Sequence, residues 1–258
     1  DILVVPVGAK TFTQALSWIV AIREMAARLG KEDGQVTNLI ADEGGLAISF
    51  TSIEKACEFV VKAIEKVGLN VGSQVGLALD IAATQFYDGG NYNLATMGKS
   101  YNQSEYLQFI NSLVSNQPII SIEDPFAEDD WQSWQNFSSQ MPAKLQLLGD
   151  DLLTTNLDRL NRAIAEKSAN AILIKPNQNG LVSATLNVLK QARANNFNTV
   201  VSARSGESED SWLADLATGW SAGQIKVGST HGSERNAKWN RLLEFEATEN
   251  TKFLNPFN

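Results

Sequence analysis

Cysteine and histidine are almost absent from this chain of 258 residues, which has one of each, Cys57 and His231. A single cysteine excludes an internal disulfide framework and is typical of a protein kept in a reducing compartment. With so few nitrogen and sulfur ligands, a zinc site is implausible. Cys57 lies in a stretch of helical periodicity, SIEKACEFVVKAI, so we expect a buried thiol rather than a reactive one. We expect His231 to take no part in catalysis.

Basic residues and long apolar runs are also scarce. The sequence has 21 lysines and arginines against 29 aspartates and glutamates, which gives a formal net charge of −8. Nucleic acids and anionic membrane surfaces bind clustered basic residues, so neither is expected as a main partner. No apolar stretch reaches the roughly 18 residues that a membrane span needs, and no signal peptide is visible. We therefore expect a cytoplasmic protein.

What the sequence does contain is a regular alternation of two patterns. Apolar, β-branched runs typical of buried strands occupy residues 2–7, 36–41, 75–80, 118–123, 145–150, 171–175, 198–204 and 224–228. Segments with apolar residues at helical spacing occupy residues 13–29, 52–67, 104–116, 157–167, 182–195, 209–219 and 234–246. The segment YDGGNYNL at 87–94 predicts a tight turn between two short extended pieces. Repeated strand–helix units predict one α/β domain over 1–258, with a parallel sheet that is either a barrel or a long doubly wound sheet.

Charged residues follow the expected strands, and their sign changes along the chain. The acidic ones come first and the basic ones follow: Asp42, Glu43, Asp80, Glu123, Asp124, Asp150 and Asp151, then Lys175, Arg204 and Lys226. The carboxyl ends of parallel strands lie on one face of a barrel, or along one edge of an open sheet, where such enzymes keep their active sites. A solvated loop accounts for any one of these charges, but not for the whole succession.

The order of the signs indicates a chemistry. Carboxylates from neighbouring strands form a hard oxygen site suited to Mg²⁺. The cations suit an anionic substrate, either a carboxylate or a phosphate. A lysine among other cations can act as a base, because its pKa is readily lowered. Together these groups predict proton abstraction next to a carboxylate, with a metal ion that stabilises the ene-diolate.

Seven motifs at these positions match a known family. They are ADEGGLA (41–47), LALD (77–80), SIEDPFAEDDW (121–131), GDDLLTTN (149–156), LIKPNQNG (173–180), SARSGESEDSWLADLATG (202–219) and GQIKVGSTHGSER (223–235). In this order they resemble the enolase family over essentially the whole chain. The resemblance implies a TIM-type α/β barrel and a hydro-lyase of glycolysis that dehydrates 2-phosphoglycerate to phosphoenolpyruvate. A lysine or histidine base with one or two Mg²⁺ ions is the arrangement already known for the enolase superfamily.

The resemblance also implies roles for individual residues. Asp80, Glu123 and Asp150 would hold the Mg²⁺ that binds the substrate carboxylate. Lys175 would remove the α-proton. Lys226 would contact the carboxylate and help to stabilise the ene-diolate.

The remaining roles concern the leaving group and the phosphate. Glu43 would protonate the departing hydroxyl, Arg204 would pair with the phosphate, and Ser205 would lie beside it. The neighbouring acids would support the lysines and the metal ligands: Asp42, Asp124 and Asp151.

The sequence departs from the family pattern in two places that matter. Ala203 stands where the family has a histidine before the arginine, so one polar contact near the phosphate or the leaving group is missing. The alignment places Asp1 on the second barrel strand, so the family's N-terminal domain and first barrel strand have no counterpart here. An incomplete barrel exposes unpaired strand edges. We therefore expect a longer natural protein, or pairing with another segment. The resemblance separately implies a homo-oligomer, a dimer or an octamer of dimers.

Two other functions stay open. One is a related lyase acting on another phosphorylated or phosphonylated acid, such as a carboxyphosphonoenolpyruvate synthase, and Ala203 favours it. The other is a catalytically silent enolase-like protein. The joint presence of Lys175, Lys226, Glu43 and the three metal ligands weighs against a silent protein.

Overall fold

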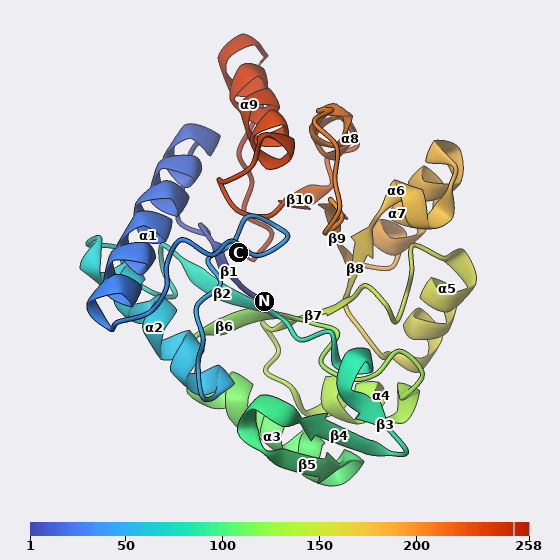
Figure 1. Ribbon diagram of the computed structural model, residues 1–258. Helices are drawn as coiled ribbons and strands as arrows, with labels where there is room; N and C mark the ends of the chain where they lie inside the picture. Colours follow the sequence, from blue (N-terminus) through green and yellow to red (C-terminus); the bar gives the residue numbers. More distant parts are fainter. Residues whose placement is uncertain (250, 258) are drawn as a thin grey trace. The chain divides into compact units, whose positions relative to one another are not determined.

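Strands and helices alternate along the computed structural model, which describes residues 1–249 and 251–257 (Figure 1). Residues 250 and 258 of the expected domain lie outside this description. The strands are β1 (Ile2–Val5), β2 (Gly76–Asp80), β3 (Tyr87–Asp88), β4 (Asn91–Leu94), β5 (Lys99–Asn102), β6 (Ile119–Glu123), β7 (Gln146–Gly149), β8 (Ala171–Ile174), β9 (Asn198–Ser202) and β10 (Gly223–Lys226). The helices are α1 (Phe12–Glu32), α2 (Ile53–Lys66), α3 (Gln103–Asn116), α4 (Trp131–Gln140), α5 (Leu157–Glu166), α6 (Pro176–Asn179), α7 (Val182–Ala194), α8 (Trp212–Gly219) and α9 (Ser233–Thr248), with short 3₁₀ turns η1 (Ala83–Phe86) and η2 (Ala95–Met97).

The main sheet has seven strands in the order β1-β2-β6-β7-β8-β9-β10. Each strand lies beside the next one of the same sheet in the chain, and the pairs β2–β6, β6–β7 and β7–β8 are parallel. A doubly wound sheet reverses its strand order at a switch point, whereas a barrel does not. The expected α/β class, a TIM-type barrel that is incomplete in this chain, is confirmed. Strands β7 and β8 are buried at every residue, as befits strands covered on both faces.

The chain divides into two compact units. The first unit comprises residues 1–3, 51–57 and 77–199, and the second comprises residues 4–50, 58–76 and 200–258. None of the helices formed by the described residues is long and apolar enough to cross a membrane.

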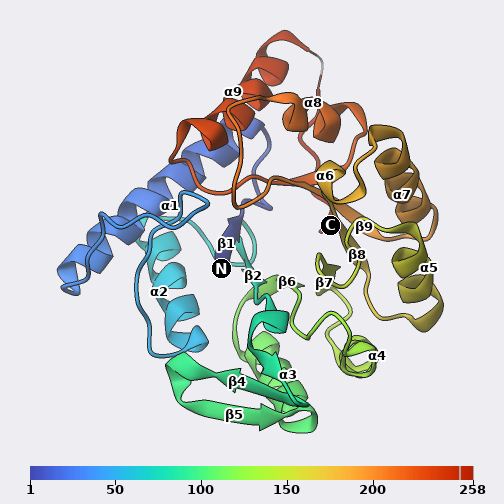
Figure 2. The ribbon, with the colours of Figure 1, turned by 45° about the vertical axis from the view of Figure 1, so that its right-hand side comes forward.

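The first unit contains a second, antiparallel sheet of β3, β4 and β5, which lies against α3 (Figure 2). Its buried anchor is Tyr92, whose ring stacks on Tyr106 with centroids 4.0 Å apart. The Tyr92 hydroxyl donates to the Asp130 carboxylate over 2.7 Å and accepts from the Ala127 amide over 3.1 Å. Burial, reinforced by the bond to Asp130, raises the pKa of Tyr92 above its usual range, so the hydroxyl stays protonated. The small sheet thereby fixes the loop that follows β6.

The second unit packs α9 beside both α1 and α8 (Figure 2). Phe12 at the start of α1 stacks on the buried Trp239 of α9, with ring centroids 6.0 Å apart. The Glu246 carboxylate of α9 accepts hydrogen bonds from the amides of Phe12 and Thr13. These are amides of the first turn of α1, which have no partner within their own helix. The C-terminal helix therefore caps the first one.

The expected strand at 36–41 is wrong. This segment lies in the connection between α1 and α2, and only Ile40 forms an isolated antiparallel bridge, to Leu46. Val36 and Leu39 are each 57% exposed, so the apolar run is not a buried strand. Its hydrogen bonds are local, for example from the Ala41 amide to the Gly45 carbonyl. Asp42 and Glu43 accordingly stand on a loop rather than at a strand end.

Other expectations about local structure have mixed outcomes. The turn at 87–94 is confirmed as the β3–β4 hairpin, and Cys57 is confirmed as a buried free thiol on α2. Helix α4, with the sequence WQSWQNFSSQ, was not among the expected helical segments. Its buried face consists of Trp131, Ser133, Trp134 and Phe137, and the Asp130 carboxylate caps its first turn.

Candidate active site

A group of three buried carboxylates lies at the carboxyl ends of two neighbouring strands in the first unit. Glu123 ends β6, Asp124 follows it, and Asp150 follows β7. Strands β6 and β7 are parallel neighbours, so these ends come together. One ligand oxygen from each residue lies within 4.8 Å of the others. The donor set consists of oxygen alone, which fits a hard divalent cation such as Mg²⁺.

Asp124 also has a structural task in this group. Its backbone adopts a positive φ of 41°, and its carboxylate accepts hydrogen bonds from the amides of Asp150 at 3.1 Å and Asp151 at 2.8 Å. Burial, reinforced by the neighbouring charge of Glu123, raises the pKa of Asp124 well above its usual range. Three buried carboxyl groups within 4.8 Å of one another repel when ionised, and a bound cation would relieve this repulsion.

Asp80, the third ligand expected from the sequence, is not part of this group. It ends β2, and in the parallel pairing of β2 with β6 it lies opposite Glu123. The structure therefore brings Glu123 and Asp150 together with Asp124, and it places Asp80 on the adjacent strand. The role of Asp80 as a ligand stays a prediction.

Lys175 contacts one member of this cluster of three carboxylates directly. It follows β8, and its Nζ donates to the Asp150 Oδ2 atom over 2.5 Å, with both side chains only 12% exposed. The other oxygen of Asp150 accepts from Gln178 Nε2 over 2.8 Å. The Lys175 amide donates to Thr155 Oγ1 over 2.9 Å, which fixes the backbone of the lysine. Lys175 is thus anchored at both its backbone and its ammonium group.

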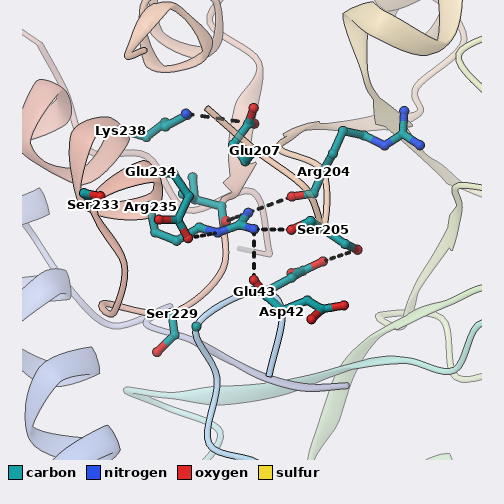
Figure 3. Close-up of polar contacts among 12 residues, drawn as sticks. Asp42, Glu43, Arg204, Ser205, Glu207, Ser229, Ser233, Glu234, Arg235 and Lys238 are labelled. Carbon is teal, nitrogen blue, oxygen red and sulfur yellow. Dashed lines mark hydrogen bonds and ion pairs between the residues drawn. The ribbon is translucent and has the colours of Figure 1, made fainter. Parts of the chain in front are cut away.

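The second unit brings together other candidate residues (Figure 3). Ser205 Oγ donates to Glu43 Oε1 over 3.3 Å, so the two side chains are in contact although they are 162 residues apart in sequence. Arg204 and Ser205 follow β9 and are exposed. The Ala203 amide donates to the Lys226 carbonyl over 2.9 Å, which joins the end of β9 to β10. Glu43, Arg204, Ser205 and Lys226 therefore come from three segments of one compact unit.

Comparison with known proteins gives the family. Residues 1–253 match the family model of the enolase C-terminal TIM barrel domain. The chain belongs to the enolase family. A curated enolase of Natranaerobius thermophilus is 43% identical to it over 243 residues, which cover 94% of this chain and 57% of that protein. The chain thus spans little more than half the length of this enolase.

Two further observations concern Ala203 and a pair of buried basic residues in this enolase-family chain. Ala203, where the resemblance implies a histidine, is 7% exposed and presents only a methyl group just after β9. Sequence reasoning also overlooked Arg235 and Lys238, which are 1% and 0% exposed. The available signal was a pair of basic residues three positions apart near the start of a helix, a spacing that places both on one face.

Proposed function

We propose that the protein catalyses the reversible dehydration of 2-phosphoglycerate to phosphoenolpyruvate, as a hydro-lyase of glycolysis and gluconeogenesis. The observation that carries this proposal is the contact of Lys175 with Asp150 beside two further buried carboxylates, in a chain of the enolase family. A base next to a cation site is what the removal of a proton α to a carboxylate requires.

Mg²⁺ is the proposed cofactor, held by Asp80, Glu123 and Asp150. When bound, it supplies positive charge opposite the substrate carboxylate as the ene-diolate develops. Glu123 and Asp150 already lie close together, and Asp80 is the residue paired with Glu123 in the sheet register. Asp124 serves as the support that orients the backbone of Asp150.

The proton steps are assigned to two residues. Lys175 accepts the proton from the α-carbon, and the ion pair with Asp150 holds its ammonium group in place when the proton has been taken up. Glu43 donates a proton to the hydroxyl that leaves from the next carbon. The contact from the Ser205 hydroxyl orients the Glu43 carboxyl group for this transfer.

The remaining candidates bind the charged ends of the substrate. Arg204 pairs with the phosphate through its planar guanidinium, with Ser205 beside it. Lys226 contacts the carboxylate and shares in stabilising the ene-diolate. We also propose a homo-oligomer in the cytoplasm, as the resemblance implied.

Formation of phosphoenolpyruvate from 2-phosphoglycerate tests the proposal. The protein at its full natural length should form the product with Mg²⁺ and should stop when the metal is chelated. Glu123→Gln should lose the reaction, because it removes a charged oxygen ligand. Product formation that persists under chelation and in Glu123→Gln would contradict the mechanism.

A second candidate rests on Ala203. Its methyl group cannot donate a hydrogen bond where the family histidine can, so the pocket could suit a different phosphorylated or phosphonylated acid. A higher kcat/KM on a phosphonylated acid than on 2-phosphoglycerate would favour this related lyase.

A further inference from the structure

Arg235, near the start of α9, binds backbone carbonyls of three separate segments (Figure 3). Its Nη1 atom donates to the carbonyls of Arg204 at 2.7 Å and Val227 at 2.9 Å. Its Nη2 atom donates to the carbonyls of Ser205 at 2.6 Å and Asp42 at 3.3 Å. The side chain is 1% exposed. A buried guanidinium with this set of partners joins segments that are far apart in the sequence.

Each of these carbonyls belongs to a candidate residue or to its immediate neighbour. Arg204 and Ser205 are candidates themselves, Asp42 precedes Glu43, and Val227 follows Lys226. We propose that Arg235 is a positioning residue that holds the leaving-group acid and the phosphate- and carboxylate-binding side chains in register with one another. This inference rests on the proposed function and assigns a part of its machinery.

The backbones that Arg235 joins are in close contact. The Ser229 amide donates to the Glu43 carbonyl over 2.8 Å. A Cβ atom on Gly228 would lie 2.6 Å from the same carbonyl, and one on Gly44 would lie 2.3 Å from the carbonyl of His231. Only glycine permits these approaches, because any larger residue would push the segments apart. A shift of one segment therefore moves the other.

Lys238, one turn further along α9, holds the same region at a second point. It is 0% exposed, and its Nζ donates to the Ser208 carbonyl. Arg235 and Lys238 lie three residues apart and so occupy one face of the helix. The segment from Arg204 to Ser208 is thus fastened to α9 by two buried cations.

The anchors of Lys175 are of a different kind. Asp150 and Thr155 hold its ammonium group and its amide, and both belong to the first unit. Lys226, which shares in stabilising the ene-diolate, is also held by the hydrogen bond from the Ala203 amide to its carbonyl. Loosening the Arg235 contacts should therefore impair the transfer of a proton from Glu43 more than the removal of a proton by Lys175. The two events are measured separately, as loss of water from the substrate and as exchange of its α-proton with solvent.

Arg235→Lys in the protein at its full natural length is the test. A lysine keeps the charge but cannot place fixed planar donors on three segments. Elimination should fall about a hundredfold, the scale of a misplacement of roughly 1 Å, while α-proton exchange falls less. The ratio of exchange to elimination should then rise at least about tenfold.

Arg241→Lys is the matched control. Arg241 lies on the same helix, but its side chain is 30% exposed and it binds the carboxylates of Asp215 and Glu244. Its replacement should leave the ratio unchanged. If Arg235→Lys does not fold, Lys238→Met should shift the ratio in the same direction by a smaller factor, because it removes the contacts to the Ser208 carbonyl and the Glu207 carboxylate.

Exchange and elimination that fall equally in Arg235→Lys, or do not fall at all, would overturn the assignment. Hydrogen–deuterium exchange of residues 42–45 and 204–210 supplies a readout that needs no activity. Arg235→Lys should speed this hydrogen–deuterium exchange in both segments, relative to Arg241→Lys. Unchanged protection would overturn the positioning role of Arg235. An unsubstituted protein that forms no phosphoenolpyruvate would defeat the proposed function alone, since backbone protection would still decide the role of Arg235.

Discussion

Replacement of Lys175 by alanine tests the centre of the proposed mechanism. The substitution removes the proposed base and also leaves the Asp150 carboxylate without its ammonium partner. The expected result is therefore double: loss of α-proton exchange and loss of stability. The loss of exchange follows from the missing base, and the loss of stability follows from the unpaired carboxylate. A change such as the addition of Mg²⁺ should therefore affect them differently.

The structure sets the size of each effect. A positioned general base contributes about 10² to 10⁴ in rate, or about 3–5 kcal/mol in the barrier. Removing one partner of a buried ion pair typically destabilises by about 3–5 kcal/mol. Both side chains keep 12% exposure, and Gln178 still donates to Asp150, so we expect the lower end of that range. Mg²⁺ should restore part of this stability, because it can replace the lost positive charge beside Asp150.

The assay follows the loss of deuterium from the α-carbon of labelled 2-phosphoglycerate by NMR, with thermal unfolding measured in parallel. Lys190→Ala is the control, since Lys190 is an exposed lysine of α7 in the same unit. It should leave both exchange and unfolding unchanged. Exchange that survives in a folded Lys175→Ala variant would refute the assignment of Lys175 as the base and would make Lys226 the next candidate.

Three further predictions concern the metal site, the residue beside the proposed phosphate-binding arginine, and the loss of stability at acid pH. Glu123→Gln should reduce the rise in Tm that Mg²⁺ produces, because it removes a charged ligand; an unchanged rise would exclude Glu123 from the site. Ala203→His should raise turnover on 2-phosphoglycerate about ten- to a hundredfold, by adding a hydrogen bond worth about 1–3 kcal/mol, and lower turnover would favour the related lyase. For Glu246, burial raises the pKa, but hydrogen bonds from Thr13 and the Phe12 amide outweigh it, so the net pKa is lowered. A lowered pKa means that this carboxylate stabilises the fold above its unfolded pKa of about 4.3 and stops doing so as the pH falls through its folded pKa. Glu246→Gln should therefore weaken the pH dependence of stability at acid pH, measured by circular dichroism. An unchanged pH dependence would contradict the contact in which Glu246 caps α1.

The carboxyl ends of the parallel strands could be predicted from sequence because the signal is local. The runs before Glu123, Asp150 and Lys175 are mostly apolar, and each is followed at once by a charge. Parallel pairing then brings these ends together without further information. The contact of Lys175 with Asp150 is the direct result.

What could not be predicted depends on distant parts of the chain. Burial of Arg235 requires the Asp42 carbonyl, 193 residues away, and a local pattern carries no sign of that partner. The apolar run containing Val36 and Leu39 has the composition of a strand, but its exposure follows from the lack of a sheet neighbour along its length. The supporting role of Asp124 was predicted from sequence, but its positive φ and its hydrogen bonds from the amides of Asp150 and Asp151 were not.

The contacts of Arg235 determine which neighbouring side chains can change during evolution. The guanidinium binds carbonyl oxygens, which every amino acid has, so the side chains at 42, 204, 205 and 227 can be exchanged without removing an acceptor. Specificity for the proposed acid substrate can then change by point substitution while the backbone contacts persist. Alanine at 203, where the resemblance implies a histidine, changes a side chain beside Arg204 and leaves the carbonyl contacts of Arg235 in place. Arg235 itself cannot be replaced in this way, because no other residue supplies the same planar set of donors.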